Sequence, residues 1–420
     1  MSHETLAKAL ILTRGIQFSD EALELAEASG AKGQNLVYNA PRGYRVGQFR
    51  PQELLLSGVD GYQTCASAVA PAGAVPVQAT VRNGRLVLGL QGADAIFSAL
   101  SDISFVPQPG YYAKTTRSGM PLTRLVSACG VDEMNIWPWH DCAISTMCTF
   151  CGVNKVNTSQ REQGVFFTAK ARRVRSALQD WESWRDTYMV NLCEAIDLAI
   201  DDPCYAEHLH LILISGNLRD DELDAQAAIY ADIARVLNAR YRPYFTEGVV
   251  AVTAPPRSIE GLQMMKDSGI DKVVFNLEAW MPDNFASECP GKQVIGRAHY
   301  LRMLREAVGI YGWGNSWCNL VLGLDSMADT IAGCAEMAQQ GITPSANVLH
   351  LDEGSRCRKP VPRPAEVAQF FRQLAQIYQQ HDLQPYYCQR ALRTSLSNEA
   401  YAGRLALQGG TDPVRLLEGL

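Results

Sequence analysis

Apolar runs of strand length recur through the second two thirds of the chain, and each is followed by a segment with helical periodicity. The expected strands cover residues 134–139, 208–216, 244–255, 272–278, 316–324 and 346–352, and the expected helices cover about 170–200, 220–240, 258–268, 296–309, 326–340 and 364–381. Continuous apolar strands that alternate with amphipathic helices predict a parallel sheet covered by helices. Six such units favour an α/β fold of the TIM-type (βα) barrel, full or partial, over a doubly wound sheet.

The first part of the chain has a different pattern. A short helical segment at 20–29 is followed by a strand-like run at 33–40. Two alternating runs at 76–90 flank Asn83-Gly84, the strongest short signal for a hairpin. The basic and aromatic stretch at 107–124 is typical of a connecting loop.

These patterns divide the chain into three parts. We expect a smaller β-rich N-terminal domain over 1–130, a barrel over 131–395 and a C-terminal tail over 396–420 that packs on the barrel. The N-terminal domain carries no motif of known chemistry. It fits a structural lid or dimer surface, and it equally fits a substrate-holding module over the barrel mouth.

Composition and charge narrow the class of protein. Of the 420 residues, 47% are hydrophobic and 20% are charged, which is ordinary for a packed enzyme. The net charge of −6 argues against a nucleic acid or an acidic membrane as partner. Residues 1–15 lack the apolar core of a signal peptide, and the apolar run at 209–214 is too short to span a membrane. We therefore expect a cytoplasmic protein, either a monomer or a homodimer.

The main chemical signal lies in residues 137–153. Cys142, Cys148 and Cys151 follow a C-x5-C-x2-C spacing, with Phe150 directly before the last cysteine. Three thiolates this close can hold three corners of a [4Fe–4S] cluster and leave one iron open for chemistry. A disulfide loop is one alternative. A zinc site with His140 as fourth ligand is another.

Further polar residues fall at the ends of the expected strands, where barrel enzymes place their active sites. These residues are Ser215, Gly216 and Asn217, then Asn276 and Glu278, then Arg297 at a helix start, and finally His350 and Asp352. Asn276 and Glu278 are two residues apart and so share one strand face. Glu278 could also be an ordinary strand-end acid and Arg297 a solvated helix residue. His350 and Asp352 could form a structural hydrogen bond.

With these residues in place, positions 131–390 resemble the radical S-adenosylmethionine (SAM) enzymes. The later half is similar to the biotin-synthase-like branch, which includes methylornithine synthase and the hydrogenase-maturation enzymes. The runs at 297–315, 319–326 and 341–355 carry this similarity, and Thr149-Phe150-Cys151 keeps the family form. Most members space their cysteines C-x3-C-x2-C. The longer first gap of this chain also occurs in the methyltransferase of the iron–guanylylpyridinol cofactor pathway.

The resemblance implies a role for each candidate residue. Cys142, Cys148 and Cys151 would ligate the cluster, with Phe150 beside the cofactor. SAM would be bound through its amine by Ser215, Gly216 and Asn217, through its ribose by Asn276 and Glu278, through its carboxylate by Arg297, and through its adenine near Leu322 and Gly323. Asn217 departs from the usual form of that motif, which carries a second glycine and an acid. Candidate substrate contacts are His350, Asp352 and His140.

The implied function is reductive cleavage of SAM at the cluster. The resulting 5′-deoxyadenosyl radical would abstract a hydrogen from a small metabolite in cofactor, amino-acid or natural-product biosynthesis. A flavodoxin or ferredoxin-type protein would supply the electron. One alternative is a transferase that moves a methyl or other SAM-derived carbon group. Another is a non-catalytic metal-binding barrel protein. The fold does not determine the substrate.

Overall fold

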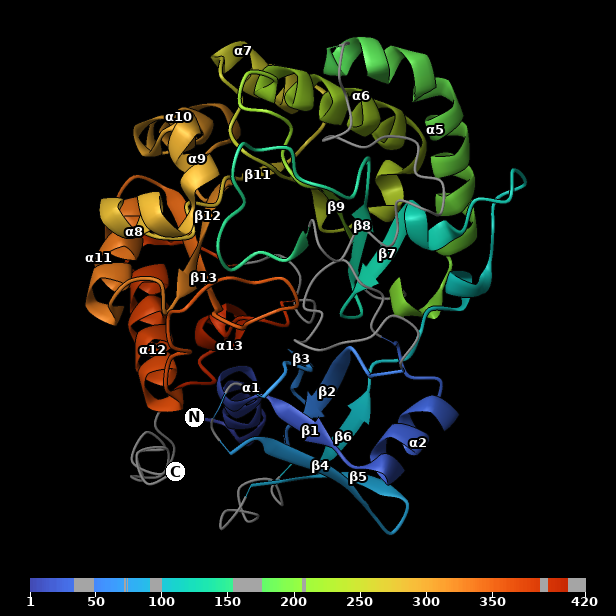
Figure 1. The fold of residues 1–420 in the computed structure, drawn as a ribbon, viewed down its shortest axis with the longest axis vertical. Helices are drawn as coiled ribbons and strands as arrows, with labels where there is room; N and C mark the ends of the chain where they lie inside the picture. Colours follow the sequence, from blue (N-terminus) through green and yellow to red (C-terminus); the bar gives the residue numbers. More distant parts are fainter. Residues whose placement is uncertain are drawn as a thin grey trace.

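A computed structural model describes residues 1–33, 49–71, 73, 75–90, 100–153, 176–205, 209–385 and 392–406 (Figure 1). Its centre is a seven-stranded sheet in the order β13-β12-β11-β10-β9-β8-β7. The strands are β7 (Val126–Cys129), β8 (Glu133–Ile136), β9 (His210–Ile214), β10 (Gly248–Val252), β11 (Lys272–Val274), β12 (Ser316–Leu322) and β13 (Ile342–Val348). Strands β8 to β13 are parallel and β7 is antiparallel to β8. The expected order of parallel strands is therefore confirmed.

The sheet is open, so a full TIM barrel is not found. Strands β13 and β7 stand at its two edges, and they do not pair with each other in the described part of the chain. A closed barrel of that type needs eight parallel strands, and this sheet has six with an antiparallel strand at one edge. The edge beyond β13 is partly covered by the chain after residue 391, where Val348 N donates to Thr394 O at 2.9 Å.

Helices cover one face of this sheet (Figure 1). They are α5 (Ala177–Ala199), α6 (Leu223–Tyr241), α7 (Ile259–Asp267), α8 (Pro282–Glu288), α9 (Pro290–Ile295), α10 (Arg297–Tyr311), α11 (Met327–Ala338) and α12 (Pro364–His381). The opposite face carries its own small buried cluster of Ile212, Val250, Val274 and Trp317, one residue from each of four neighbouring strands. Because side chains alternate across a strand, these central strands are apolar on both faces.

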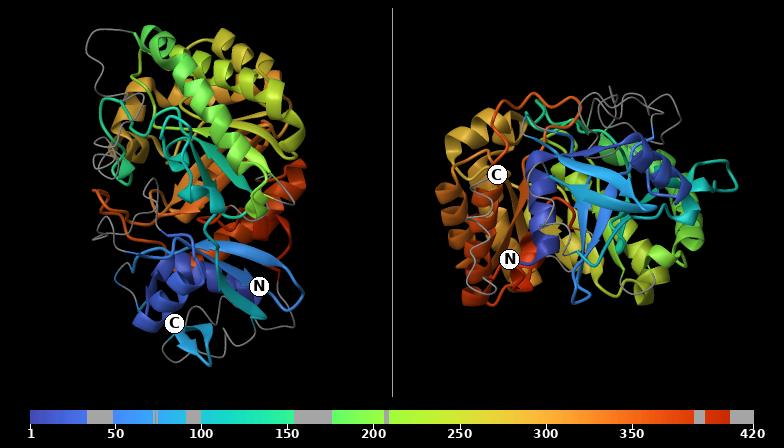
Figure 2. Two further views of the ribbon diagram at one scale, coloured as in Figure 1. Left: turned by 90° about the vertical axis from the view of Figure 1, so that its right-hand side faces the viewer. Right: turned by 90° about the horizontal axis from the view of Figure 1, so that it is seen from below.

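The N-terminal part forms a second lobe with two three-stranded sheets, β1-β4-β5 and β3-β2-β6 (Figure 2). Its elements are α1 (His3–Arg14), β1 (Ile16–Phe18), α2 (Asp20–Ala28), β2 (Glu53–Ser57), β3 (Gln63–Ser67), β4 (Val77–Arg82), β5 (Arg85–Gly89) and β6 (Asp102–Phe105). The predicted hairpin is present, and Asn83 and Gly84 both have positive φ, as its turn requires. Helix α1 was not predicted. The run expected at 33–40 lies, beyond Gly33, outside the described residues.

A buried charge cluster joins this lobe to the large sheet. The Glu53 carboxylate meets Lys32 Nζ at 2.5 Å and Arg393 Nη1 at 2.5 Å, and Lys32 Nζ also donates to Ala128 O. The boundary expected at residue 130 falls inside the β7–β8 hairpin, so β7 belongs to the large sheet. In the tail, α13 (Ser397–Tyr401) is tied to β13 through Ser397 and Ser345.

Within the ranges described above, no helix combines the length and the apolar character that a membrane crossing requires.

Candidate active site

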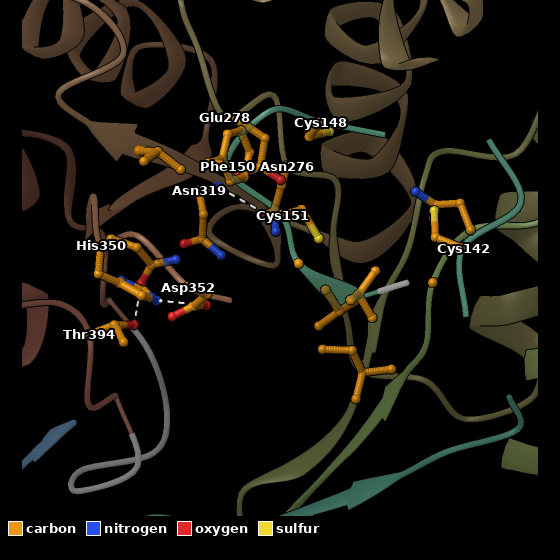
Figure 3. A pocket seen from close by; sticks show the side chains of 18 of the residues that line it. Cys142, Cys148, Phe150, Cys151, Asn276, Glu278, Asn319, His350, Asp352 and Thr394 are labelled. Atoms are coloured by element: carbon orange, nitrogen blue, oxygen red, sulfur yellow. Dashed lines mark hydrogen bonds and ion pairs between the residues drawn. The ribbon is translucent and has the colours of Figure 1, made fainter. Parts of the chain in front are cut away.

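The cysteine loop follows β8 and opens onto a cavity. Cys142, Cys148 and Cys151 all line this cavity, whose volume is about 360 Å³ (Figure 3). Small-molecule sites typically enclose about 300–1,000 Å³. The cavity wall continues over Ile212, Ile214 and Val252, so it lies on the sheet face that the helices leave free.

Three glycines let the surrounding chain approach the loop closely. A Cβ on Gly216 would lie 2.2 Å from Asp141 O, one on Gly291 would lie 2.3 Å from Thr146 O, and one on Gly152 would lie 2.0 Å from Glu353 O. No side chain larger than hydrogen fits at such distances without displacement of the backbone. The loop is therefore held between the end of β9, the start of α9 and the segment after β13.

Backbone hydrogen bonds reinforce the same three contacts. Ala143 N donates to Asn217 O at 2.7 Å, and Thr149 N donates to Glu288 O at 2.8 Å. Thr149 O accepts from Cys357 N at 3.0 Å. Cluster ligation depends on where the sulfurs lie, and these bonds fix the backbone that carries them.

The three thiols differ in their electrostatic surroundings. Burial raises the pKa of Cys142 to about 11, and it also raises the pKa of Cys151. The pKa of Cys148 is lowered, mainly because the Cys289 thiol donates a hydrogen bond to its sulfur. Metal ligation must therefore displace protons from Cys142 and Cys151.

No group of three or more His, Cys, Asp or Glu side chains among the described residues is close enough to hold a single metal ion. A [4Fe–4S] cluster places each cysteine on a different iron, so its ligands stand farther apart than those around one ion.

Asn276 and Glu278 lie together on the cavity wall after β11 (Figure 3). Glu278 has a φ of 71°, a conformation that side-chain-bearing residues rarely adopt and that concentrates at functional sites. Lys292 Nζ lies 2.6 Å from Glu278 Oε1 and donates to Asn276 O at 2.7 Å. Burial alone would lower the pKa of Lys292, but the Glu278 carboxylate outweighs it and the pKa is raised. One oxygen of the carboxylate expected at the ribose is thus engaged by a lysine.

Two buried polar atoms of the cavity wall have no hydrogen-bond partner within the described residues. They are Thr253 Oγ1, just after β10, and Asn319 Oδ1 in β12. A buried polar group without a partner costs about 1–3 kcal/mol, and native structures rarely retain one without a reason. The cavity is therefore suited to a polar ligand, and its three cysteines fit an iron–sulfur cluster.

His350 and Asp352 line the cavity away from Cys142 (Figure 3). Their side chains form a pair at 3.4 Å, and His350 Nδ1 lies 3.0 Å from Val348 O. Burial acts to lower the pKa of His350, but the Asp352 carboxylate outweighs it, so the pKa is raised. Arg393 and Thr394 complete this end of the cavity.

Four expected residues do not line the cavity. Arg297 donates from Nε to Trp280 O at 2.9 Å, and its guanidinium stacks 4.7 Å above the Trp280 ring. Leu322 and Gly323 do not line the cavity, whereas the neighbouring Val321 does.

His140 is buried, stacked on Trp137, and hydrogen-bonded through Nε2 to Arg124 O at 2.9 Å. In the structure His140 packs on Trp137 and Arg297 packs on Trp280, and neither side chain lines the cavity.

The sequence interpretation missed Cys289, Lys292, Thr253, Asn319 and Arg393. Only Asn319 had a local signal, as a polar residue within the otherwise apolar run at 316–324. Lys292 lies in α9, a six-residue helix with no periodicity to detect. Arg393 reaches the cavity only because the chain returns beside β13.

No protein-family model matches the chain. It is 28% identical over 194 residues to the bacteriochlorophyllide c C-7(1)-hydroxylase of Chlorobaculum limnaeum, over 44% of this chain and 46% of that enzyme. The chain thus spans about half the length of this curated relative. The relative is named as an enzyme, in line with the expectation that this chain is one.

Two solved structures are similar at a lower level. A radical SAM methyltransferase from Sphaerobacter thermophilus aligns over 86% of this chain and 78% of its own, with 14% identity and a TM-score of 0.39. The hydrogenase maturase HydG from Carboxydothermus hydrogenoformans aligns over 59% and 50%, with 12% identity and a TM-score of 0.34.

Proposed function

We propose that the protein is a radical SAM enzyme that acts on a small molecule in a biosynthetic pathway. The observation that carries the proposal is the convergence of Cys142, Cys148 and Cys151 on one cavity with Asn276 and Glu278. When bound, a [4Fe–4S] cluster and SAM would supply one-electron cleavage and a 5′-deoxyadenosyl radical.

The chain's own residues would bind and orient these groups. The three cysteines would hold the cluster, while the turn after β9 and the residues after β11 would contact SAM. Thr253 Oγ1 and Asn319 Oδ1 would accept hydrogen bonds from ligand hydroxyl or amine groups. The apolar wall of Ile212, Ile214 and Val252 would keep water from the reacting centre.

Hydrogen abstraction is favoured over carbon transfer. The curated relative is named as a hydroxylase, and hydroxylation of a carbon requires cleavage of a C–H bond. His350 and Asp352 would then contact the substrate, and a flavodoxin or ferredoxin-type protein in the cytoplasm would deliver the electron. We also propose that the large sheet is a partial barrel that ends at about residue 395, with the N-terminal lobe ending before β7.

The test is anaerobic reconstitution of the full chain with iron and sulfide. The expected result is a broad visible absorbance and release of 5′-deoxyadenosine when SAM and a reductant are added. Cys148→Ala should remove the absorbance while the chain stays folded, and Cys334→Ala, in α11, should retain it. A wild-type chain that binds no iron, or never cleaves SAM, would contradict the proposal.

The products separate the alternatives. S-adenosylhomocysteine or methylthioadenosine would indicate the transferase, whereas 5′-deoxyadenosine with methionine would indicate abstraction. A metal that is needed for folding and supports no SAM cleavage would indicate the non-catalytic protein.

A further inference from the structure

The chain between β13 and α12 lies directly against the cysteine loop. Arg356 N and Cys357 N donate to Thr149 O at 2.6 and 3.0 Å, and the Arg356 side chain donates from Nη2 to Met147 O at 3.2 Å. Residues 355–359 are therefore tied to the second half of the cysteine loop.

Three cations of this segment line a hollow in the surface. They are Arg356, Arg358 and Lys359, and the two arginines are exposed. None of the three forms an ion pair with a residue in the described ranges. Arg356 donates to Met147 O and Lys359 Nζ donates to Asn284 Oδ1 at 2.9 Å, and both of these acceptors are uncharged. The segment thus presents three positive charges without a carboxylate partner among the described residues.

This local charge contrasts with the rest of the molecule. The whole chain has a net charge of −6, and an exposed arginine elsewhere, Arg240, pairs with Asp197. Glu288 also contacts Thr149, but its carboxylate accepts from the Thr149 hydroxyl and forms no ion pair with the three cations. A cluster of uncompensated charge of one sign attracts a partner of opposite charge and raises its rate of association.

We propose that Arg356, Arg358 and Lys359 form the docking surface for an acidic electron-donor protein that reduces the cluster. The inference rests on the proposed function, because only a cluster held by this loop needs an electron here. In the docked complex the donor would lose one electron and the cluster would gain it, with no bond made or broken. A donor seated on this hollow would lie beside the loop that carries the cysteines, and a short separation favours electron transfer.

The first test is the affinity of the full chain for a flavodoxin of negative net charge, measured by isothermal titration calorimetry. Binding should weaken as the ionic strength rises from about 0.01 to about 0.15 M, because the screening length falls from about 30 to about 8 Å. Arg358→Glu reverses an exposed charge that makes no hydrogen bond within the described ranges, and it should weaken binding at least about tenfold at low ionic strength. The matched control is Arg85→Glu, which reverses an exposed cation of β5 in the N-terminal lobe and should bind like the wild type.

The second test is the rate at which the reduced flavodoxin reduces the reconstituted cluster, followed anaerobically by stopped-flow absorbance. Arg358→Glu should slow this reaction when the donor is limiting, and Arg358→Gln should lie between it and the wild type. Arg85→Glu should react at the wild-type rate. Dithionite, a small reductant that needs no docking surface, should reduce the cluster to the same extent in every variant.

Each outcome decides the inference. Salt-dependent binding that is lost in Arg358→Glu and kept in Arg85→Glu supports it. Binding that does not depend on salt, an unchanged affinity in Arg358→Glu, or an equal loss in both variants overturns it, as does a wild-type chain that does not bind the flavodoxin. A chain that assembles no cluster contradicts the proposed function, whereas a chain that assembles one and binds the donor without Arg358 contradicts only this inference.

Discussion

At the scale of single residues, the site combines unsatisfied groups with tightly paired ones. Thr253 Oγ1 and Asn319 Oδ1 have no hydrogen-bond partner within the described residues. The Glu278 side chain, in contrast, is paired with Lys292, and its backbone has a positive φ. A residue at positive φ persists only when its surroundings hold it there. Lys292 meets that need, because it binds the Glu278 carboxylate and the Asn276 carbonyl together.

Lys292→Met should destabilise the fold. It leaves the largely buried Glu278 carboxylate without its partner, and breaking a buried ion pair costs about 3–5 kcal/mol. The double change Lys292→Met with Glu278→Gln removes the unpaired charge and should recover part of the loss. Urea unfolding of the wild type, both single variants and the double variant measures the coupling. Strictly additive effects would show that the two side chains do not interact.

His140 should make the protein less stable in mild acid. Burial lowers the pKa of His140 from 6.5 to about 4. Between pH 6.5 and 4, His140 is therefore protonated in the unfolded chain and neutral in the folded chain. Stability should therefore fall as pH drops from about 6.5 to 4, by roughly 3 kcal/mol from this residue. Thermal unfolding of wild type and His140→Gln across this range should show a steeper loss in the wild type. Parallel profiles would contradict the prediction.

At the scale of elements, the sequence predicted those strands, helices and turns that have a regular local pattern of residues. The parallel strands and the hairpin at Asn83-Gly84 were recognisable because burial on both faces and a two-residue turn leave local signatures. Helices α8 and α9 were missed because they are short and lack periodicity. Cavity residues that directly follow the end of a strand were predicted. Cavity residues such as Arg393, which belong to a distant part of the chain that returns beside β13, were not predicted.

Gly216→Ala tests how closely the end of β9 supports the cysteine loop. The new Cβ would lie 2.5 Å from Cys142 Cα, so the loop must shift. We expect a clear loss of iron on reconstitution, with the circular dichroism of the fold retained. The matched control is Gly309→Ala, which adds a Cβ to open space in α10 and should stabilise by about 0.5–1 kcal/mol. Equal iron content in both variants would show that the close approach is not needed.

At the scale of the whole molecule, buried ion pairs connect the N-terminal lobe to the C-terminal part of the chain beside the large sheet. Glu53 holds Lys32 from its own lobe and Arg393 from the far end of the chain, and Arg393 in turn lines the cavity. The two lobes therefore share one buried charge cluster, and the lobe supports the cavity end that holds His350 and Asp352.

Glu53→Gln should weaken this junction strongly. Two buried cations lose their carboxylate, and the expected cost is about 3–5 kcal/mol. Asp197→Asn is the comparison, because its pair with Arg240 at 2.5 Å is exposed and worth less than about 1 kcal/mol. Differential scanning calorimetry of both variants should show a much larger fall in Tm for Glu53→Gln. Similar falls in Tm for the two variants would show that the Glu53 ion pairs do not stabilise the junction between the lobes more than an exposed pair does.

Helix α1 has a consequence for the order of folding. Its Lys8 forms a buried pair with Glu399 at 2.8 Å and donates to Leu392 O, and Ser2 N donates to Arg404 O. These partners are separated by about the whole described chain, and closing so long a loop costs more entropy than forming a local contact. When α1 leaves the ribosome, Leu392, Glu399 and Arg404 have not yet been synthesised. The contacts of Lys8 and Ser2 therefore form only after the C-terminal segment has been synthesised, which makes the docking of α1 dependent on that segment.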